Sequence, residues 1–164
     1  MNKNQMIVEE LRSIILDKNV VQLFAKDEEF SFLVAKYAKK VWLSKDEKRQ
    51  YDRAANRPSN IIYNYVDIDS RVNSVNSDVF LIFNKSKYFK KNYHKIISFL
   101  ERNLTNRNCV VVASNSFFDK GKLNDINKLT KNNLQLDVII DITKFNYRYI
   151  VIKRKERRDM YGFF

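Results

Sequence analysis

The chain has 164 residues, which fits one domain with its own hydrophobic core. Apolar residues make up 45% of it, which excludes a disordered protein, and no apolar run approaches the roughly 20 residues that cross a bilayer. The formal net charge of +12 predicts attraction to a polyanion. The single cysteine, Cys109, excludes an internal disulfide.

The N-terminal stretch has early acidic residues and no continuous apolar run, unlike a secretory signal. This favours an intracellular protein, in the cytoplasm, a virus factory or an organelle matrix. The chain has 2 glycines and 1 proline but many Asn, Lys, Ile, Phe and Tyr residues, whose codons are A/T-rich. The composition therefore favours a viral, organellar or other AT-rich genome.

Residues 1–57 have apolar side chains at helical spacing and predict about three helices. The second of these covers residues 30–41. The third begins at Ser44, with a glutamate three residues later as in a capping box, and ends before Pro58. Residues 20–25 fit either a short strand or a helical turn. The first helix places these side chains on one face: Ile7, Val8, Leu11, Ile14 and Ile15.

Residues 60–153 alternate between strand and helix patterns, which predicts an α/β fold with a Rossmann-like, mostly parallel sheet. The short connection between the last two strands predicts a C-terminal antiparallel hairpin. With residues 154–164 as a basic, aromatic tail, the chain is predicted to form a single domain, 1–164. The predicted strands are 60–68, 79–83, 109–113, 136–142 and 147–152, and the predicted helices are 86–104 and 122–132.

The segment Asn108 to Phe118, N-C-V-V-V-A-S-N-S-F-F, resembles the buried strand and N-S-F-F segment of the Rossmann-like N6-adenine DNA methyltransferases. Residues 122–142 resemble the next helix and strand of that family, and residues 149–153 resemble its final antiparallel strand. The resemblance covers residues 78–153 and implies the sheet of a methyltransferase. A ribosomal protein with a nucleotide-binding type of fold would have a similar pattern.

The resemblance does not extend to the motifs that carry the family's chemistry. The family's loop for S-adenosylmethionine is rich in glycine, but the glycines here are Gly121 and Gly162, neither of which follows a first strand. Its catalytic tetrapeptide has an Asp or Asn, two prolines and an aromatic residue. Here Asn84 is followed by Lys85 and Ser86. The resemblance therefore implies a degenerate relative with the sheet and without the site, and no cofactor is predicted.

Positive charge gathers in the second part of the chain. Residues 1–59 hold 12 basic and 9 acidic side chains, whereas residues 60–164 hold 19 and 10. One group follows the helix 86–104, and the other lies among tyrosines near the C-terminus. Basic groups neutralise phosphates while aromatic rings stack on bases. The predicted nucleic-acid-binding residues are Lys87, Lys90, Lys91, Lys95, Arg102, Arg148, Lys153, Arg154, Lys155, Arg157 and Arg158.

These features favour a non-catalytic protein that binds the backbone of RNA or single-stranded DNA. We expect it in a larger nucleoprotein assembly, such as a ribosome or a viral complex, with protein partners and without a membrane. Catalysis is disfavoured because the motifs are missing. One alternative is a degenerate methyltransferase-like subunit or a metal-dependent nucleotide enzyme. Another is an interaction protein with an acidic partner.

The metal-dependent alternative uses Asp67 and Asp69, which lie two residues apart at the end of a predicted strand. Two carboxylates on one strand face can bind Mg²⁺ for phosphoryl transfer. A simpler interpretation is that one of them caps a turn.

Overall fold

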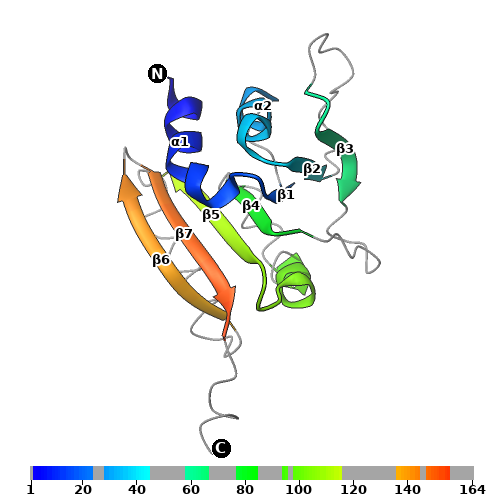
Figure 1. The fold of residues 1–164 in the computed structure, drawn as a ribbon. Helices are drawn as coiled ribbons and strands as arrows, with labels where there is room; N and C mark the ends of the chain where they lie inside the picture. Colours follow the sequence, from blue (N-terminus) through cyan, green and yellow to red (C-terminus); the bar gives the residue numbers. More distant parts are fainter. Residues whose placement is uncertain are drawn as a thin grey trace, which may run out of the picture.

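The structure of the protein is a computed structural model (Figure 1). It describes residues 2–23, 28–44, 58–66, 77–84, 94–95, 98–115, 136–144 and 147–155. The elements in chain order are α1 (Lys3–Ile15), β1 (Asn19–Leu23), α2 (Glu28–Tyr37), β2 (Lys40–Ser44), β3 (Ile61–Val66), β4 (Val79–Asn84), β5 (Cys109–Asn115), β6 (Leu136–Lys144) and β7 (Tyr147–Arg154). Residues 94–95 and 98–103 are also helical.

The strands form one sheet in the order β3-β2-β1-β4-β5-β7-β6. Strands β1 to β5 are parallel. Strand β7 is antiparallel and lies between β5 and β6. This arrangement confirms the predicted Rossmann-like, mostly parallel sheet with a C-terminal antiparallel hairpin. All five strands predicted after residue 60 are present, with ends within two residues of the prediction.

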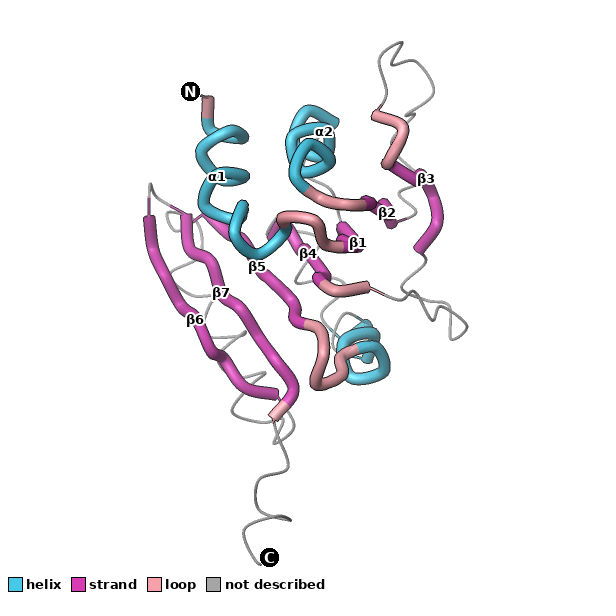
Figure 2. Tube along the Cα trace, in the orientation of Figure 1, coloured by secondary structure: helices cyan, strands magenta, loops and turns pink. Residues whose placement is uncertain are grey.

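Helices cover both faces of the sheet (Figure 2). On one face, α1 and α2 bury Leu11 and Phe30 against alternate strand residues such as Val111. On the other face, the helical segment 98–103 places Phe99 edge-to-face on Phe80 of β4, with 5.6 Å between ring centroids. Burial on both faces explains the nearly continuous apolar sequences of β1, β4 and β5. Within the described residues, no helix is long and apolar enough to span a bilayer.

The first part of the chain differs from the prediction of about three consecutive helices. The second helix ends at Tyr37, and Val41, predicted to be helical, lies in β2. Of the stretch 20–25, which fitted either a strand or a turn, residues 20–23 belong to β1, and residues 24–25 lie outside the described residues. Helical spacing and strand alternation are alike over so few residues, and pairing with β1 and β3 buries β2 as a strand. Ser44 ends β2, and residues 45–57, predicted as the third helix, lie outside the described residues.

Candidate functional site

Strand order reverses between β1 and β4, which lie side by side with Leu23 opposite Ile82. In open α/β sheets, ligands bind in the crevice beyond the carboxyl ends of the strands at such a switch point. Helix α2 begins at Glu28, shortly after β1 ends at Leu23, and α1 lies beside it (Figure 1). The candidate site is therefore this carboxyl edge of the sheet.

Gln22 is a fully buried polar residue one position before the end of β1. The Ser31 hydroxyl of α2 donates a hydrogen bond to the Gln22 Oε1 at 3.0 Å. The Gln22 Nε2 has no hydrogen-bond partner in the described part of the chain. An unpaired buried polar group costs about 1–3 kcal/mol. A polar ligand or a bound water at this point would remove that cost.

The first turn of α2 is acidic, with Glu28 and Glu29. The Glu28 Oε1 is buried and has no hydrogen-bond partner among the described residues. The Glu29 carboxylate accepts hydrogen bonds from the side-chain amides of Asn2 (2.6 Å) and Asn4 (3.2 Å), which joins the starts of α1 and α2. A helix N-terminus normally attracts phosphate. Two carboxylates there repel it, so this edge disfavours the pyrophosphate of a dinucleotide and is compatible with a neutral or cationic ligand.

Sequence reasoning missed these side chains. Gln22 is the one polar residue in the apolar run Val20 to Leu23, and a polar residue near the end of a first parallel strand is the signal that points to it. Its pairing with Ser31 was not readable, because α2 was predicted two residues late.

The predicted nucleic-acid-binding residues are distributed over several places. Arg148 is the second residue of β7, and its Nε and Nη2 donate to Asp141 of β6 at 2.6 and 2.5 Å. This pairing lowers the pKa of the Asp141 carboxyl below its ordinary value. Arg154 donates from Nη1 to the Leu104 carbonyl at 3.0 Å. These two arginines therefore hold elements of the fold together.

The remaining predicted residues stay predictions. Exposed side chains in the described part are Lys95, Arg102, Lys153 and Lys155. Outside the described residues lie Lys87, Lys90, Lys91, Arg157 and Arg158, and also the candidate metal ligands Asp67 and Asp69. Among the described residues, no cluster of three or more His, Cys, Asp or Glu side chains could hold a metal ion.

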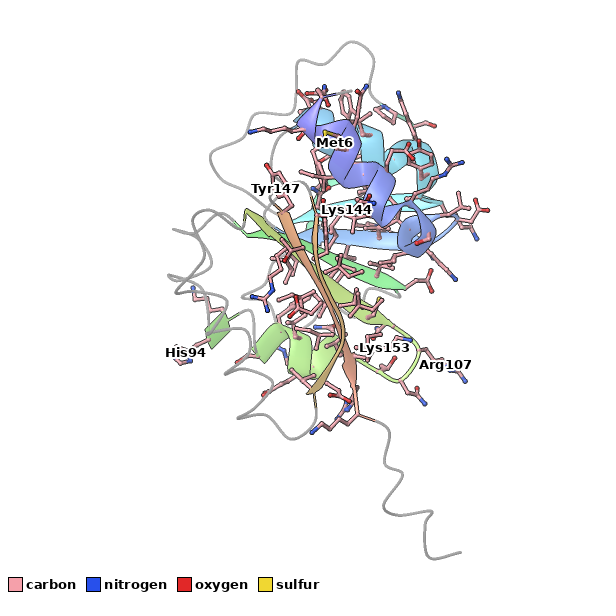
Figure 3. The ribbon with its side chains drawn as sticks, turned by 90° about the vertical axis from the view of Figure 1, so that its left-hand side faces the viewer. Met6, His94, Arg107, Lys144, Tyr147 and Lys153 are labelled. Carbon is pink, nitrogen blue, oxygen red and sulfur yellow. The ribbon has the colours of Figure 1, made fainter. Side chains whose placement is uncertain are left out.

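Cys109 is buried at the start of β5, and burial raises the pKa of its thiol. It is therefore mainly protonated near neutral pH and is a poor nucleophile. His94 is exposed and lies on the side of the molecule away from Arg107 (Figure 3).

No protein-family model and no curated protein sequence matches the chain. Several solved structures with the same fold are named methyltransferases. The N-methyltransferase NodS of Bradyrhizobium japonicum matches with a TM-score of 0.69 at 14% identity, over 94% of this chain and 96% of that one. The ribosomal protein L11 methylase of Lactobacillus delbrueckii subsp. bulgaricus matches with a TM-score of 0.67 at 14% identity, over 93% and 77%.

The fibrillarin pre-rRNA processing protein of Methanococcus jannaschii matches with a TM-score of 0.63 at 14% identity, over 86% of this chain and 68% of that one. The likeness covers the N-terminal part as well, whereas the sequence resemblance began at Asp78. The chain therefore has the Rossmann-like fold of the S-adenosylmethionine-dependent methyltransferases. This finding overturns the expectation of a non-catalytic nucleic-acid-binding protein, and the alternative of a methyltransferase-like subunit agrees with it better.

The residues at the carboxyl edge do not fit S-adenosylmethionine as a glycine-rich loop would hold it. The sequence after β1 is Phe24-Ala25-Lys26-Asp27, and a Cβ atom at each of these positions opposes a close approach of the backbone to the cofactor. The Gln22 Nε2 and the Glu28 Oε1, which have no hydrogen-bond partner among the described residues, offer polar contacts, but they do not replace that approach.

Proposed function

We propose that this chain is a degenerate methyltransferase-like subunit, which keeps the methyltransferase sheet without the cofactor loop and works in a methylating assembly. The observation that carries the proposal is the seven-stranded sheet, β3-β2-β1-β4-β5-β7-β6, with no glycine among residues 24–27 directly after β1. Such a subunit would contribute a rigid surface for the substrate or for a catalytic partner, while another chain supplies the cofactor.

Two considerations support RNA or a ribosomal component as the substrate of this assembly. One structural neighbour is named a ribosomal protein L11 methylase, and another a pre-rRNA processing protein. The net charge of +12 is also of the sign that raises the local concentration of a nucleic acid.

Calorimetry tests the loss of the cofactor site. The purified chain is titrated with S-adenosylmethionine and with S-adenosylhomocysteine, and NodS is the positive control. We expect no binding heat from this chain up to about 1 mM ligand, because residues 24–27 contain no glycine that would allow a close approach of the backbone to the cofactor. A dissociation constant below about 100 μM for either ligand would show that the site is intact.

Methyl transfer tests the role in an assembly. The tagged chain is isolated from its host, and the isolated complex is supplied with S-adenosylmethionine carrying a radioactive methyl group. We expect the complex to label RNA or a ribosomal protein, whereas the purified chain alone labels neither. A complex that transfers no methyl group to either substrate would contradict the proposal.

A further inference from the structure

The amino edge of the sheet, opposite the candidate site, carries exposed cations. At this edge β1, β2, β4 and β5 begin and β7 ends. Three of the cations lie at the starts of β1 and β2, and one precedes β5. The other two lie at the end of β7, one within the strand and one directly after it. We name them the basic edge: Lys18, Lys39, Lys40, Arg107, Lys153 and Lys155, all of them exposed.

Backbone hydrogen bonds bring these distant parts of the sequence together. The Lys39 N–H donates to the Lys18 carbonyl at 2.9 Å. The Asp78 N–H donates to the Asn19 carbonyl at 2.9 Å, and the Cys109 N–H donates to the Asp78 carbonyl at 3.2 Å. The starts of β2, β1, β4 and β5 therefore lie in one row.

Strand β7 continues the row, because Ile152 lies opposite Val110 of β5. Burial raises the pKa of the Cys109 thiol, and the charges of Lys153 and Lys18 lower it by a smaller amount. Both charges therefore lie near the start of β5. Figure 3 shows Lys153 and Arg107 at the same end of the sheet, away from Tyr147.

Carboxylates offset only part of this charge. Asp17, Asp78 and Asp137 lie at the same edge. The Asp78 carboxylate accepts a hydrogen bond from the Asn19 N–H at 2.9 Å, and Asp137 lies opposite Lys153 in the β6–β7 register. In the described part of the chain, none of the basic-edge residues forms an ion pair within 4.0 Å. The Lys40 ammonium lies 5.4 Å from the centre of the Trp42 ring.

We propose that the basic edge binds the phosphate backbone of RNA. Neighbouring strands lie about 4.8 Å apart, so the row from β2 to β7 extends about 19 Å. One strand of a duplex presents one charge about every 3.4 Å along the helix axis, and at that spacing the row spans about five or six phosphates. The choice of RNA rests on the proposed substrate class, but the position and the charge of the basic edge do not.

A row of cations fits a nucleic-acid backbone better than a protein partner, because a stable protein interface has an apolar centre. Among the described residues, the exposed large apolar side chains are Leu16, Ile139, Ile140 and Ile142. Only Leu16 adjoins the basic edge in sequence, whereas the three isoleucines belong to β6.

Fluorescence anisotropy of the full chain with a labelled single-stranded RNA tests the proposal. The RNA has about 20 nucleotides, so that it is longer than five or six phosphates. The variant K39Q/K153Q removes two cations of the basic edge. Its control, K3Q/K36Q, removes two exposed cations on α1 and α2. A single-strand contact contributes about 0.7 to the slope of log K against log salt. The edge variant should therefore bind about tenfold more weakly near 100 mM salt and lose about 1.4 from that slope, whereas the control should stay close to the unmodified chain.

The variant K39R/K153R keeps both charges and should bind like the unmodified chain, which separates loss of charge from loss of fold. Unchanged affinity and slope in K39Q/K153Q, or an equal loss in K3Q/K36Q, would overturn the proposal. Polyglutamate at the same concentration of negative charges as the RNA should not displace the RNA. If it does, the proposal is overturned, and the partner of the basic edge is an acidic protein. Because no cofactor is present, these results are independent of the calorimetric test of the proposed function.

Discussion

At the residue scale, Arg148 shows how a side chain with the right charge can serve the fold. Its pairing partner, Asp141, lies seven residues earlier in the sequence and across the hairpin. The Arg148 side chain is 20% exposed, and that of Asp141 is 38% exposed. The two-point contact holds the guanidinium in one orientation, which favours a role in joining β6 to β7.

This pair predicts a pH-dependent contribution to stability. Pairing lowers the pKa of Asp141 in the folded state, so the unfolded chain takes up the proton at a higher pH. The contribution is complete above the unfolded pKa of about 4 and is lost as the pH falls through the folded pKa. The free energy of unfolding of R148M at pH 7 should therefore be about 0.5–1 kcal/mol lower than that of the unmodified chain, a small difference because the pair is partly exposed.

Urea unfolding between pH 7 and pH 3 measures this difference. It should shrink as the pH falls below about 4. The variant D141N is the control, because it should show the same loss at pH 7. A difference between R148M and the unmodified chain that stays constant with pH would contradict the assigned role of the pair.

At the element scale, the start of α1 is defined by local bonds. The Asn2 side chain accepts from the Gln5 N–H at 2.9 Å, and the Gln5 side chain accepts from the Asn2 N–H at 3.0 Å, which is a capping box. The Asn2 amide also donates to Glu29 of α2. Asn2 therefore caps the start of α1 and joins α1 to α2, the helix at the candidate site.

Replacement of this cap should destabilise the protein without unfolding it. The variant N2A removes both side-chain bonds of Asn2, and the loss of an N-cap costs about 1 kcal/mol. Urea unfolding at pH 7 measures the free energy of unfolding. The neighbouring exposed variant K3A is the control and should change it by less than about 0.5 kcal/mol. Equal stabilities of N2A and the unmodified chain would mean that the cap contributes nothing.

Prediction of elements succeeded where the pattern was long or the connection was short. Helix α1 and the strands β4 to β7 were readable, because each has its own apolar run and boundary residues. Strand β2 was not, since Val41 also continues the helical spacing of α2. Pairing with β1 and β3, which local sequence does not contain, decides between the two.

At the scale of the whole molecule, the net charge of +12 opposes the compact state through self-repulsion. Ion pairs such as Glu9–Arg12, Glu10–Lys144 and Asp141–Arg148 offset little of this charge. Salt screens such repulsion over a Debye length of about 10 Å at 0.1 M. Added salt should therefore stabilise this protein.

Thermal unfolding tests this expectation. An increase from about 20 to about 300 mM NaCl should raise the melting temperature by about 2–4 °C, which corresponds to about 1 kcal/mol for a domain of this size. The same increase in KCl is the control for a specific ion effect. A melting temperature that falls with both salts would mean that attractive charge pairs outweigh the repulsion.

The fold class and the absence of glycine directly after β1 both follow from local sequence. The alternation of strands and helices after residue 60 predicts the parallel sheet, and the few residues between the last two predicted strands favour the antiparallel hairpin. The absence of glycine at residues 24–27, directly after β1, is readable from the sequence alone, because it depends only on residue type.

The strand order, the partners of Gln22 and Arg148, and the basic edge depend on contacts between distant parts of the chain. Lys18, Lys39, Arg107 and Lys153 are spread over most of the sequence and meet only because parallel strands begin at a common edge. Periodicity reports which side of an element is apolar. It does not report which strand lies beside it, and the insertion of β7 between β5 and β6 is determined by packing of the whole sheet.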